Sequence, residues 1–395
     1  MVLLTTRMPP LPPSLPSAHQ PPERPTPAAS GKVGVRAGRM PMVDVLKGVS
    51  CMLIVLHHLA FYGPMSDVAL PLAPLLIGWL YDYGRMAVQV FLVLGGYLAA
   101  ASLAPQGIAR FDSATQQIAR RFVRLVVPYA VALVLALLAA ALVRPWLDNP
   151  SVPDEPSLVQ LLAHVLLLQG LLGQDSLSAG GWYVAIDFQL FALTVLGLTL
   201  ARRLQSRTAQ RAPWGMLLVG CMALASLLYF NLHAALDDTA LYFFGAYGLG
   251  MLAFWAGRSP HARYWLVLLA LLGVLALVLQ FRGRIAVALV VALWLGVAQA
   301  WPRLQQWPRH ADLQAVGQMS YSVFLIHFPV CLLVNAVVSH LWPTQPLVNL
   351  LGMLVAFGLS LLAGAVLYRC VEARPVSVPK LLGIQAGLVV VGLVA

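Results

Sequence analysis

Charged side chains are scarce in this sequence. Only 10% of its 395 residues are Asp, Glu, Lys or Arg, whereas 60% are hydrophobic. A soluble domain carries about 25% charged residues, so this chain has too few to cover a surface in water. Most of the chain must therefore face lipid or other helices.

Cysteine is also rare, and the amino-terminal region lacks the apolar core of a signal peptide. The four cysteines lie in or beside apolar runs and have no paired spacing that would suit a metal or a disulfide framework: Cys51, Cys221, Cys331 and Cys370. We therefore expect no metal. Residues 1–40 are rich in Pro and Ala, and we predict that they form a disordered cytoplasmic tail.

Long apolar runs dominate the remaining sequence. Each has about 18 to 22 residues, enough for a helix to cross a hydrocarbon core of about 30 Å. We predict an all-α, polytopic bundle of about ten transmembrane helices in a membrane domain at 41–380, followed by a hydrophobic tail at 381–395. The predicted spans are 43–62, 86–103, 123–143, 182–201, 214–230, 241–255, 264–280, 285–301, 321–338 and 348–368. Two shorter apolar stretches, 68–83 and 158–173, are predicted to be interfacial or re-entrant.

The distribution of arginine predicts the orientation. A net charge of +11 would suggest nucleic acid as a partner of a soluble protein, but here the basic residues lie in alternate loops between spans. This is the positive-inside pattern, so the expected partner is the bilayer and both termini are predicted to be cytoplasmic. The acidic loop at 148–155 then lies outside, and the outer turn with Arg282 and Arg284 is the exception.

The first span carries ionisable residues on one face. Lys47 and His58 are eleven positions apart, so they point in nearly the same direction and lie about 16 Å apart along the helix. Charged groups within the membrane are costly and are candidate functional residues. The alternative is that Lys47 extends to the interface and His58 is structural. His57 points about 100° away, and we interpret it as structural.

Two further spans contain buried polar residues. Asp187 lies about one and a half turns inside its span, where a carboxylate needs a partner, and His58 at similar depth is the expected one. His327 lies two turns inside another span and is followed by Pro329, which frees a backbone carbonyl. An acid at a wet interface and a satisfied structural histidine are the alternatives.

Arginines also cluster at the start of the third span. Arg120, Arg121 and Arg124 are explained by topology alone, but their density also suits a phosphate-bearing donor from the cytoplasm. Arg85 lies at the outer edge of the second span, ahead of the pair Gly95 and Gly96, which allows a close helix approach.

Taken in chain order, these polar segments resemble those of the acyltransferase-3 family of bacterial membrane proteins, which acylate sugar hydroxyls of surface glycans. The matching features are Lys47 and His58 with ten residues between them, the segment 90–97, the arginines from Arg120, the stretches 182–191 and 320–327, and Val-Glu-Ala-Arg-Pro at 371–375. The sequence departs from the family pattern at Gly95, often serine, at Gln89, often an acid, and at Asp187, usually glutamate.

The resemblance implies an O-acyltransferase of the bacterial inner membrane that moves an acyl group, acetyl above all, from acyl-CoA to a polysaccharide, glycolipid or related acceptor. His58 would be the base or a transient acyl carrier, and Asp187 would orient its ring. Lys47 and the arginines Arg120, Arg121 and Arg124 would hold the donor phosphates. The remaining predicted residues would line the substrate cavity: Trp182, Gln189, Tyr321, His327 and Arg85.

Two other classes of function stay open. A transporter of a glycan or small anion would also place His and Asp in the membrane, although no inverted repeat is visible. A structural or assembly subunit would not need aligned ionisable residues. The family's appended esterase-like domain is absent, so a separate periplasmic partner protein is a further expectation. The sequence leaves the acyl group, the acceptor and the oligomeric state open.

Overall fold

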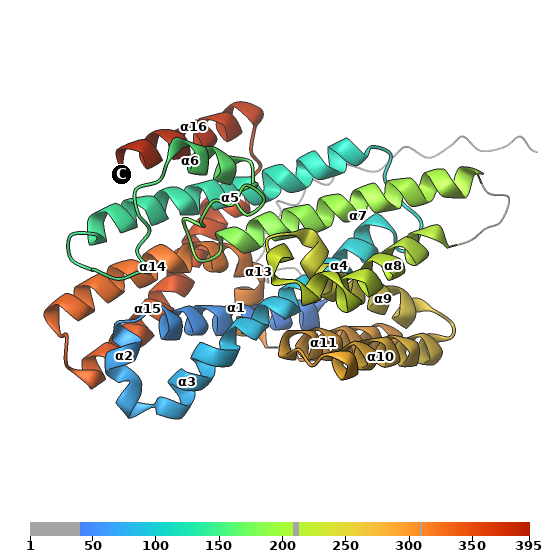
Figure 1. Ribbon diagram of the computed structural model, residues 1–395, viewed down its shortest axis with the longest axis horizontal. Coiled ribbons are helices and arrows are strands. Elements are labelled where there is room, and N and C mark those ends of the chain that lie inside the picture. The colour runs from blue at the N-terminus through green and yellow to red at the C-terminus, as the bar shows by residue number, and fades with distance from the viewer. Residues whose placement is uncertain (1–39, 208–212, 309) are drawn as a thin grey trace, which may run out of the picture. The chain divides into compact units, whose positions relative to one another are not determined.

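A computed structural model describes residues 40–207, 213–308 and 310–395, and within these residues the secondary structure is helical, with no strand (Figure 1). Ten helical segments are long and apolar enough to cross a membrane, as predicted. They are α1 (Pro41–Phe61), α3 to α4 (Pro74–Leu103), α5 (Ala114–Val143), α7 (Gly181–Arg207), α8 with η3 (Trp214–Leu232), α9 (Ala240–Arg258), α10 (Ala262–Leu279), α11 (Gly283–Ala300), α14 (Ser320–Leu341) and α15 with η5 (Pro346–Glu372). Each predicted span coincides with one of them.

The two shorter apolar stretches form short helices. Between α1 and α4 the chain forms α2 (Met65–Ala69), η1 (Leu70–Leu72) and α3 (Pro74–Tyr83), which continues into α4 (Ala87–Leu103) through η2 (Gly84–Met86). Pro71 and Pro74 stand in the first turns of η1 and α3, where the missing N–H costs nothing. The helix α6 (Leu158–Val165) has only eight residues, so it is too short to cross a bilayer.

A buried histidine joins α6 to the loop that precedes α7. His164 Nδ1 lies 2.8 Å from the carbonyl oxygen of Gln160, and the backbone N–H of Leu177 donates to His164 Nε2 at 3.1 Å. Burial lowers the pKa of His164 below its ordinary value. The neutral ring with its proton on Nδ1 therefore satisfies both bonds, which supports a structural role for this residue.

Glycines allow the central helices to pack closely. A Cβ atom on Gly96 of α4 would lie 1.8 Å from the carbonyl oxygen of Tyr247 of α9, and one on Gly250 of α9 would lie 2.0 Å from that of Val93. Only glycine fits such backbone contacts, as in other membrane helix pairs. The span α9 is the most deeply buried of the ten and α10 is the most peripheral.

The two arginines that break the charge pattern serve as helix caps. Arg282 donates from Nη2 to the carbonyl oxygens of Leu227 and Ala276, in the last turns of α8 and α10, and from Nη1 to Asn231 Oδ1. Arg284 donates to the Asn231 carbonyl. Carbonyls at helix ends lack partners within the helix, so these guanidinium groups stabilise the turn between α10 and α11.

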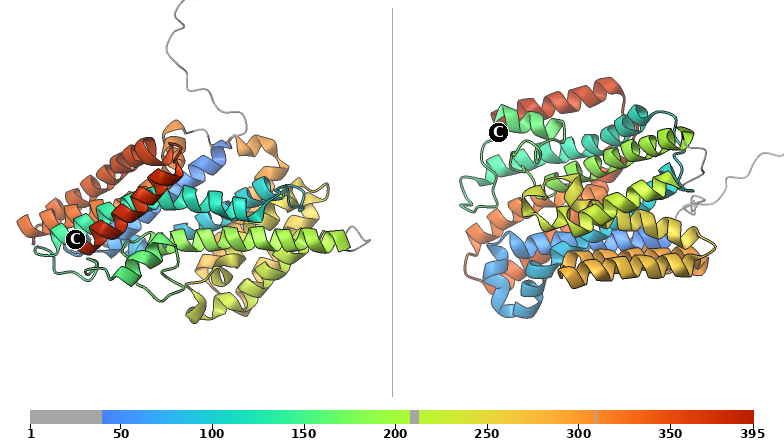
Figure 2. Two further views of the ribbon diagram at one scale, coloured as in Figure 1. Left: turned by 90° about the horizontal axis from the view of Figure 1, so that it is seen from above. Right: turned by 45° about the vertical axis from the view of Figure 1, so that its right-hand side comes forward.

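The carboxyl-terminal residues form a further helix along the bundle. The helix α16 (Val378–Val394) contacts α5 and α6 (Figure 2), and Arg144 donates to the carbonyl oxygen of Ala395 at 2.9 Å. Arg144 lies about 30 Å along α5 from Arg124. Arg124 and Lys47 of α1 both lie near Glu372, so the start of α1 and Ala395 are at different ends of α5.

The described chain therefore begins and ends at opposite ends of the bundle. The helix α16 is shorter than the ten candidate spans, and the cytoplasmic position of both termini stays a prediction. The hydrophobic tail predicted at 381–395 lies mostly in α16, which ends at Val394 and packs lengthwise against α5. Which end faces the cytoplasm stays a prediction of the charge pattern.

Fusions of a reporter that is active only in the periplasm test this arrangement. We expect signal after Asp154 and after Ala395, which lie toward one end, and no signal after Arg207, which ends the helix α7 that crosses back. Opposite results at Asp154 and Ala395 would mean that α16 does not cross. Signal at Arg207 alone would invert the predicted orientation.

Candidate functional site

Two histidines from helices far apart in sequence meet inside the bundle. His58 Nδ1 of α1 lies 2.7 Å from His327 Nε2 of α14, and the ring planes are 7° from parallel with centroids 4.8 Å apart. The thiol of Cys51 donates to the carbonyl oxygen of Ser320 at 3.3 Å, which fixes α1 beside α14. Both residues were predicted as site residues, but their direct contact was not.

The exposure of the two rings differs, and this assigns them different roles. His327 is fully buried, whereas His58 is partly exposed. His327 Nδ1 faces the carbonyls of Val323 and Phe324 and makes no hydrogen bond of standard geometry. With the His327 proton on Nδ1, its Nε2 accepts from His58 Nδ1–H, and His58 Nε2 then carries a lone pair. The pair can therefore present one basic nitrogen.

The neighbouring histidine faces elsewhere, as the helical geometry predicted. His57 is buried, and its Nδ1 lies 2.9 Å from the carbonyl oxygen of Leu80 in α3. A Cβ atom on Gly84 would lie 2.8 Å from His57 Cβ, so the ring packs tightly at this turn. Arg85 follows on η2, is exposed, and interacts electrostatically with His57. This grouping supports a structural role for His57.

Asp187 does not contact His58, which corrects the expected pairing. Arg121 Nη2 donates to Asp187 Oδ2 at 2.5 Å, and the two side chains are 26% and 9% exposed. The Arg121 guanidinium also lies 5.2 Å from the ring centre of Phe191. A carboxylate in an apolar bundle is better compensated by a permanent cation with several donors than by an imidazole, and Arg121 on α5 reaches it first.

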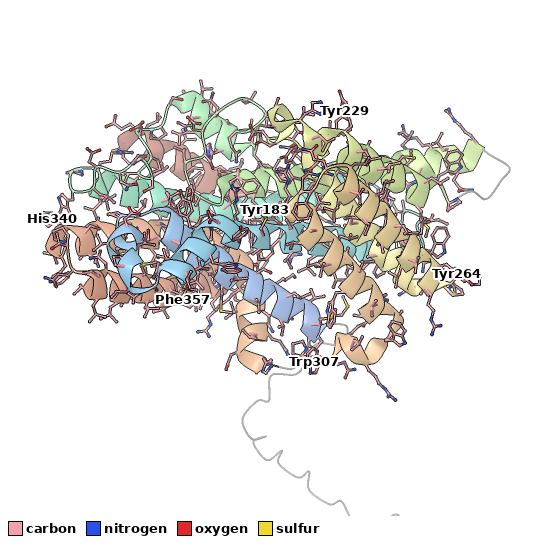
Figure 3. All side chains as sticks on the ribbon, turned by 60° about the horizontal axis from the view of Figure 1, so that its bottom comes forward. Tyr183, Tyr229, Tyr264, Trp307, His340 and Phe357 are labelled. Atoms are coloured by element: carbon pink, nitrogen blue, oxygen red, sulfur yellow. The ribbon has the colours of Figure 1, made fainter. Side chains whose placement is uncertain are left out.

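Tyrosines surround this ion pair. Tyr183, Tyr247 and Tyr321 are each close enough to interact electrostatically with both Asp187 and Arg121. Figure 3 shows Tyr183 in the middle of the bundle, and its ring lies 5.3 Å from that of Phe324, which in turn lies 6.1 Å from His327. An aromatic contact therefore separates the ion pair from the histidine pair.

Gly95 borders the carboxylate of Asp187. A Cβ atom on Gly95 would lie 3.2 Å from the Tyr247 ring and 3.8 Å from Asp187 Oδ1. A serine here would have to find room beside that ring, so glycine at this position fits the packing around the ion pair.

The predicted cation cluster is divided by the fold. Arg121 turns inward to Asp187, while Arg120 and Arg124 remain exposed. Arg124 and Lys47 lie close enough to Glu372 to interact with its carboxylate, which accepts a hydrogen bond from Ser322 Oγ at 2.6 Å.

Glu372 lies beside two of the predicted donor residues, although the sequence analysis does not predict it as a site residue. It stands within Val-Glu-Ala-Arg-Pro at 371–375, and an acid at the end of a long apolar span is a usable signal. It belongs to a π-helical turn, η5 (Tyr368–Glu372), a distortion that is often found at functional sites.

The other predicted cavity residues make contacts between helices. Gln189 Oε1 accepts from the backbone N–H of Ala240, at the first residue of α9, and Tyr321 donates to the carbonyl oxygen of Leu125 at 2.8 Å. Trp182 packs against Phe243 at 5.8 Å. Within the residues that the structure describes, no group of three or more His, Cys, Asp or Glu side chains could hold a metal.

Substitution of the ion pair should cost stability. We expect Asp187→Asn and Arg121→Gln each to destabilise the bundle by about 1–3 kcal/mol, less than a fully buried pair because Arg121 is partly exposed. The double variant should lose less stability than the sum of the losses in the two single variants, because the ion pair is lost only once. Thermal unfolding in detergent measures this, and purely additive effects would show that the two groups do not interact.

Sequence comparison agrees with this arrangement of helices and polar groups. The model of a family described as an acyltransferase domain matches residues 41–369, which covers all ten spans to within a few residues. Neither a curated protein nor a solved structure matches the chain significantly. Because the family model covers most of the chain, this protein belongs to the acyltransferase-3 family of membrane proteins.

Proposed function

We propose that this protein is an O-acyltransferase of the bacterial inner membrane that moves an acyl group, acetyl above all, from acyl-CoA to a hydroxyl of a surface polysaccharide or glycolipid. The observation that carries the proposal is the hydrogen-bonded pair of His58 and His327, in which His327 is buried and His58 is partly exposed. Acyl transfer to a hydroxyl needs one positioned base, and this pair supplies it. A transporter would not require two hydrogen-bonded histidines of which one ring is buried and the other partly exposed.

In this mechanism His58 Nε2 removes the proton of the acceptor hydroxyl. The hydroxyl oxygen attacks the thioester carbonyl carbon, the new C–O bond forms, and the C–S bond breaks. The thiolate of coenzyme A then takes the proton from the His58 imidazolium, so charge and protons balance. His327 accepts from His58 Nδ1–H throughout, and this stabilises the imidazolium. His327 thus orients the His58 ring, which is the role predicted from the sequence for Asp187.

The donor phosphates are proposed to bind where Arg120, Arg124 and Lys47 lie. Arg120 and Arg124 are exposed near the start of α5, and Arg124 and Lys47 both lie close enough to Glu372 to interact with its carboxylate. Guanidinium groups bind phosphate oxygens through several hydrogen bonds. Lys47 and His58 are eleven positions apart on α1, or about 16 Å along the helix, a distance that the long pantetheine arm of the donor would bridge.

The acceptor is proposed to reach His58 from the end of α1 that carries Tyr62, whose ring stacks on His58 at 5.2 Å. Under the predicted orientation this is the outer side, where surface glycans and lipid-linked sugars are available. A separate periplasmic protein could present the acceptor there. Trp182 and Arg85 are proposed to contact it.

Substitution of the histidines separates catalysis from scaffolding. We expect His58→Ala to lower the turnover number by roughly 100-fold or more, since a positioned base contributes this much, and to leave thermal stability near wild type. His57→Ala is the matched control: it should keep most activity and lose some stability, because its bond to the Leu80 carbonyl disappears.

These variants are assayed by mass spectrometry of acylated glycans and glycolipids from cells that express each one. His327→Gln should lower turnover less than His58→Ala, because its ring acts through His58. Substantial transfer by a well-folded His58→Ala protein would contradict the mechanism. An equal loss of activity in the His57→Ala protein would show that His58 is not the reactive histidine.

Substitution of the cations tests the donor site. Arg120→Gln with Arg124→Gln should raise the apparent KM for acyl-CoA by roughly tenfold with little change in turnover, since phosphate contacts bind substrate and transition state alike. Glu372→Gln should also raise KM by loosening Arg124 and Lys47. An unchanged KM in a correctly inserted double variant would leave these arginines as topology signals only.

A further inference from the structure

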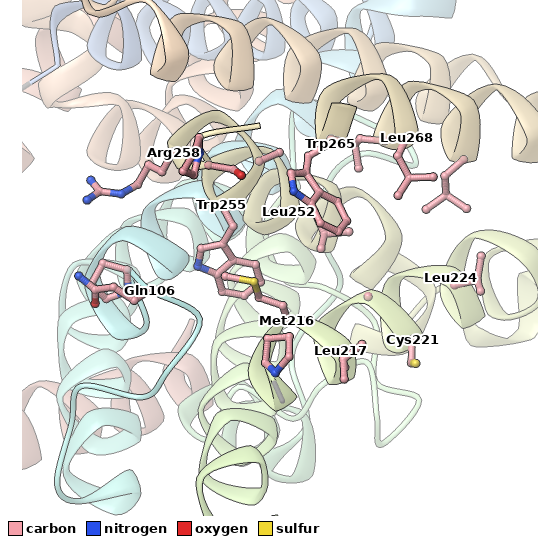
Figure 4. A pocket seen from close by; sticks show the side chains of 18 residues that line it. Gln106, Met216, Leu217, Cys221, Leu224, Leu252, Trp255, Arg258, Trp265 and Leu268 are labelled. Carbon is pink, nitrogen blue, oxygen red and sulfur yellow. The ribbon is translucent and has the colours of Figure 1, made fainter. Parts of the chain in front are cut away.

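An apolar groove opens between α8, α9 and α10, away from the histidine and ion pairs. Its volume is about 700 Å³, and its lining is almost entirely apolar, with Met216, Leu217 and Leu252 among its side chains (Figure 4). Helix α10 is the most peripheral of the ten spans, so a groove along it faces the surface that the bilayer covers.

Two tryptophans shape the groove. Trp255 is 6% exposed, and its indole N–H donates to the carbonyl oxygen of Ala104 at 2.7 Å, so its ring forms a fixed floor. Trp265 of α10 is 52% exposed and forms a wall. Tryptophan is enriched where a membrane meets water, so this part of the groove suits the level of the lipid head groups.

The charge at the groove has one sign. Arg258, in the last turn of α9, lines it and lies 5.5 Å from the ring centre of Phe254. No Asp or Glu is among the residues that line the groove, and the remaining polar side chains there are neutral, such as Gln106 and Ser259. An apolar channel with a single cation beside it is complementary to an acyl chain attached to an anionic head group.

We propose that this groove binds an anionic phospholipid, with one acyl chain along Met216 and Leu217 and the head-group phosphate at Arg258. The proposal does not depend on acyl transfer, because none of the residues assigned to that reaction lines the groove. An acyl chain is the occupant because the groove is apolar along its length and opens where the surroundings are lipid.

Native mass spectrometry of the full chain measures this binding. After delipidation, the protein is titrated with phosphatidylglycerol or with phosphatidylcholine of identical acyl chains. We expect one site that prefers phosphatidylglycerol by roughly tenfold, the size expected for one charge-assisted contact. Arg258→Gln should remove the preference and retain weak binding of both lipids.

Two glycine variants test the position of the chain. A Cβ atom on Gly220, in the groove, has no neighbour within 4 Å, so Gly220→Leu fills the groove without a clash and should abolish the site. Gly358→Leu on α15 is the matched control: its Cβ position is equally open but lies outside the groove, and binding should persist.

Cysteine labelling gives a second readout. Cys221 lines the groove and is exposed, whereas exposed Cys370 lines a separate apolar groove that has no charged side chain. Phosphatidylglycerol in detergent should slow the reaction of Cys221 with N-ethylmaleimide several-fold and leave Cys370 unchanged. Equal binding of the two lipids, unaltered binding by Gly220→Leu, or equal protection of both cysteines would each overturn the proposal.

Discussion

Polar groups inside a helix bundle of this composition must find their partners within the bundle, because lipid provides none. The rest of the architecture follows from that constraint. Asp187 is compensated by Arg121, Glu372 by Ser322 with two nearby cations, and the His58 ring by His327. Each of these contacts joins residues from different helices. They therefore specify which helices lie together, a choice that interchangeable apolar faces leave undetermined.

The same constraint separates the ion pair of Asp187 and Arg121 from the pair of His58 and His327, although the sequence predicts that Asp187 and His58 belong to one site. The ion pair lies among tyrosines, next to the backbone contact of α4 with α9. The histidine pair lies between α1 and α14. Between them stand the rings of Tyr183 and Phe324. A charged pair whose two members come from different helices suits a role in assembling the helices, whereas a histidine pair with one partly exposed ring suits proton transfer.

The proposed donor site and the proposed lipid groove both depend on arginines that stay exposed. Arg121 pairs with a carboxylate and Arg282 donates to helix carbonyls, so both have structural roles. Arg120, Arg124 and Arg258 remain exposed at the protein surface. Arginines that look alike in the sequence thus divide into structural and available groups, and only the available ones can meet a phosphate from a soluble donor or from a lipid.

The sequence by itself determined the number and position of the spans, because a long apolar run has one stable form in lipid and its length is readable residue by residue. It also determined that His57 and His58 face different directions, since helical phase is local. Only the tertiary structure decided that His58 meets His327, that Asp187 meets Arg121, and that 381–394 belong to a helix along α5. Those contacts depend on how helices are arranged around one another, and that arrangement depends on glycine contacts and polar pairs between distant segments, which no local pattern contains.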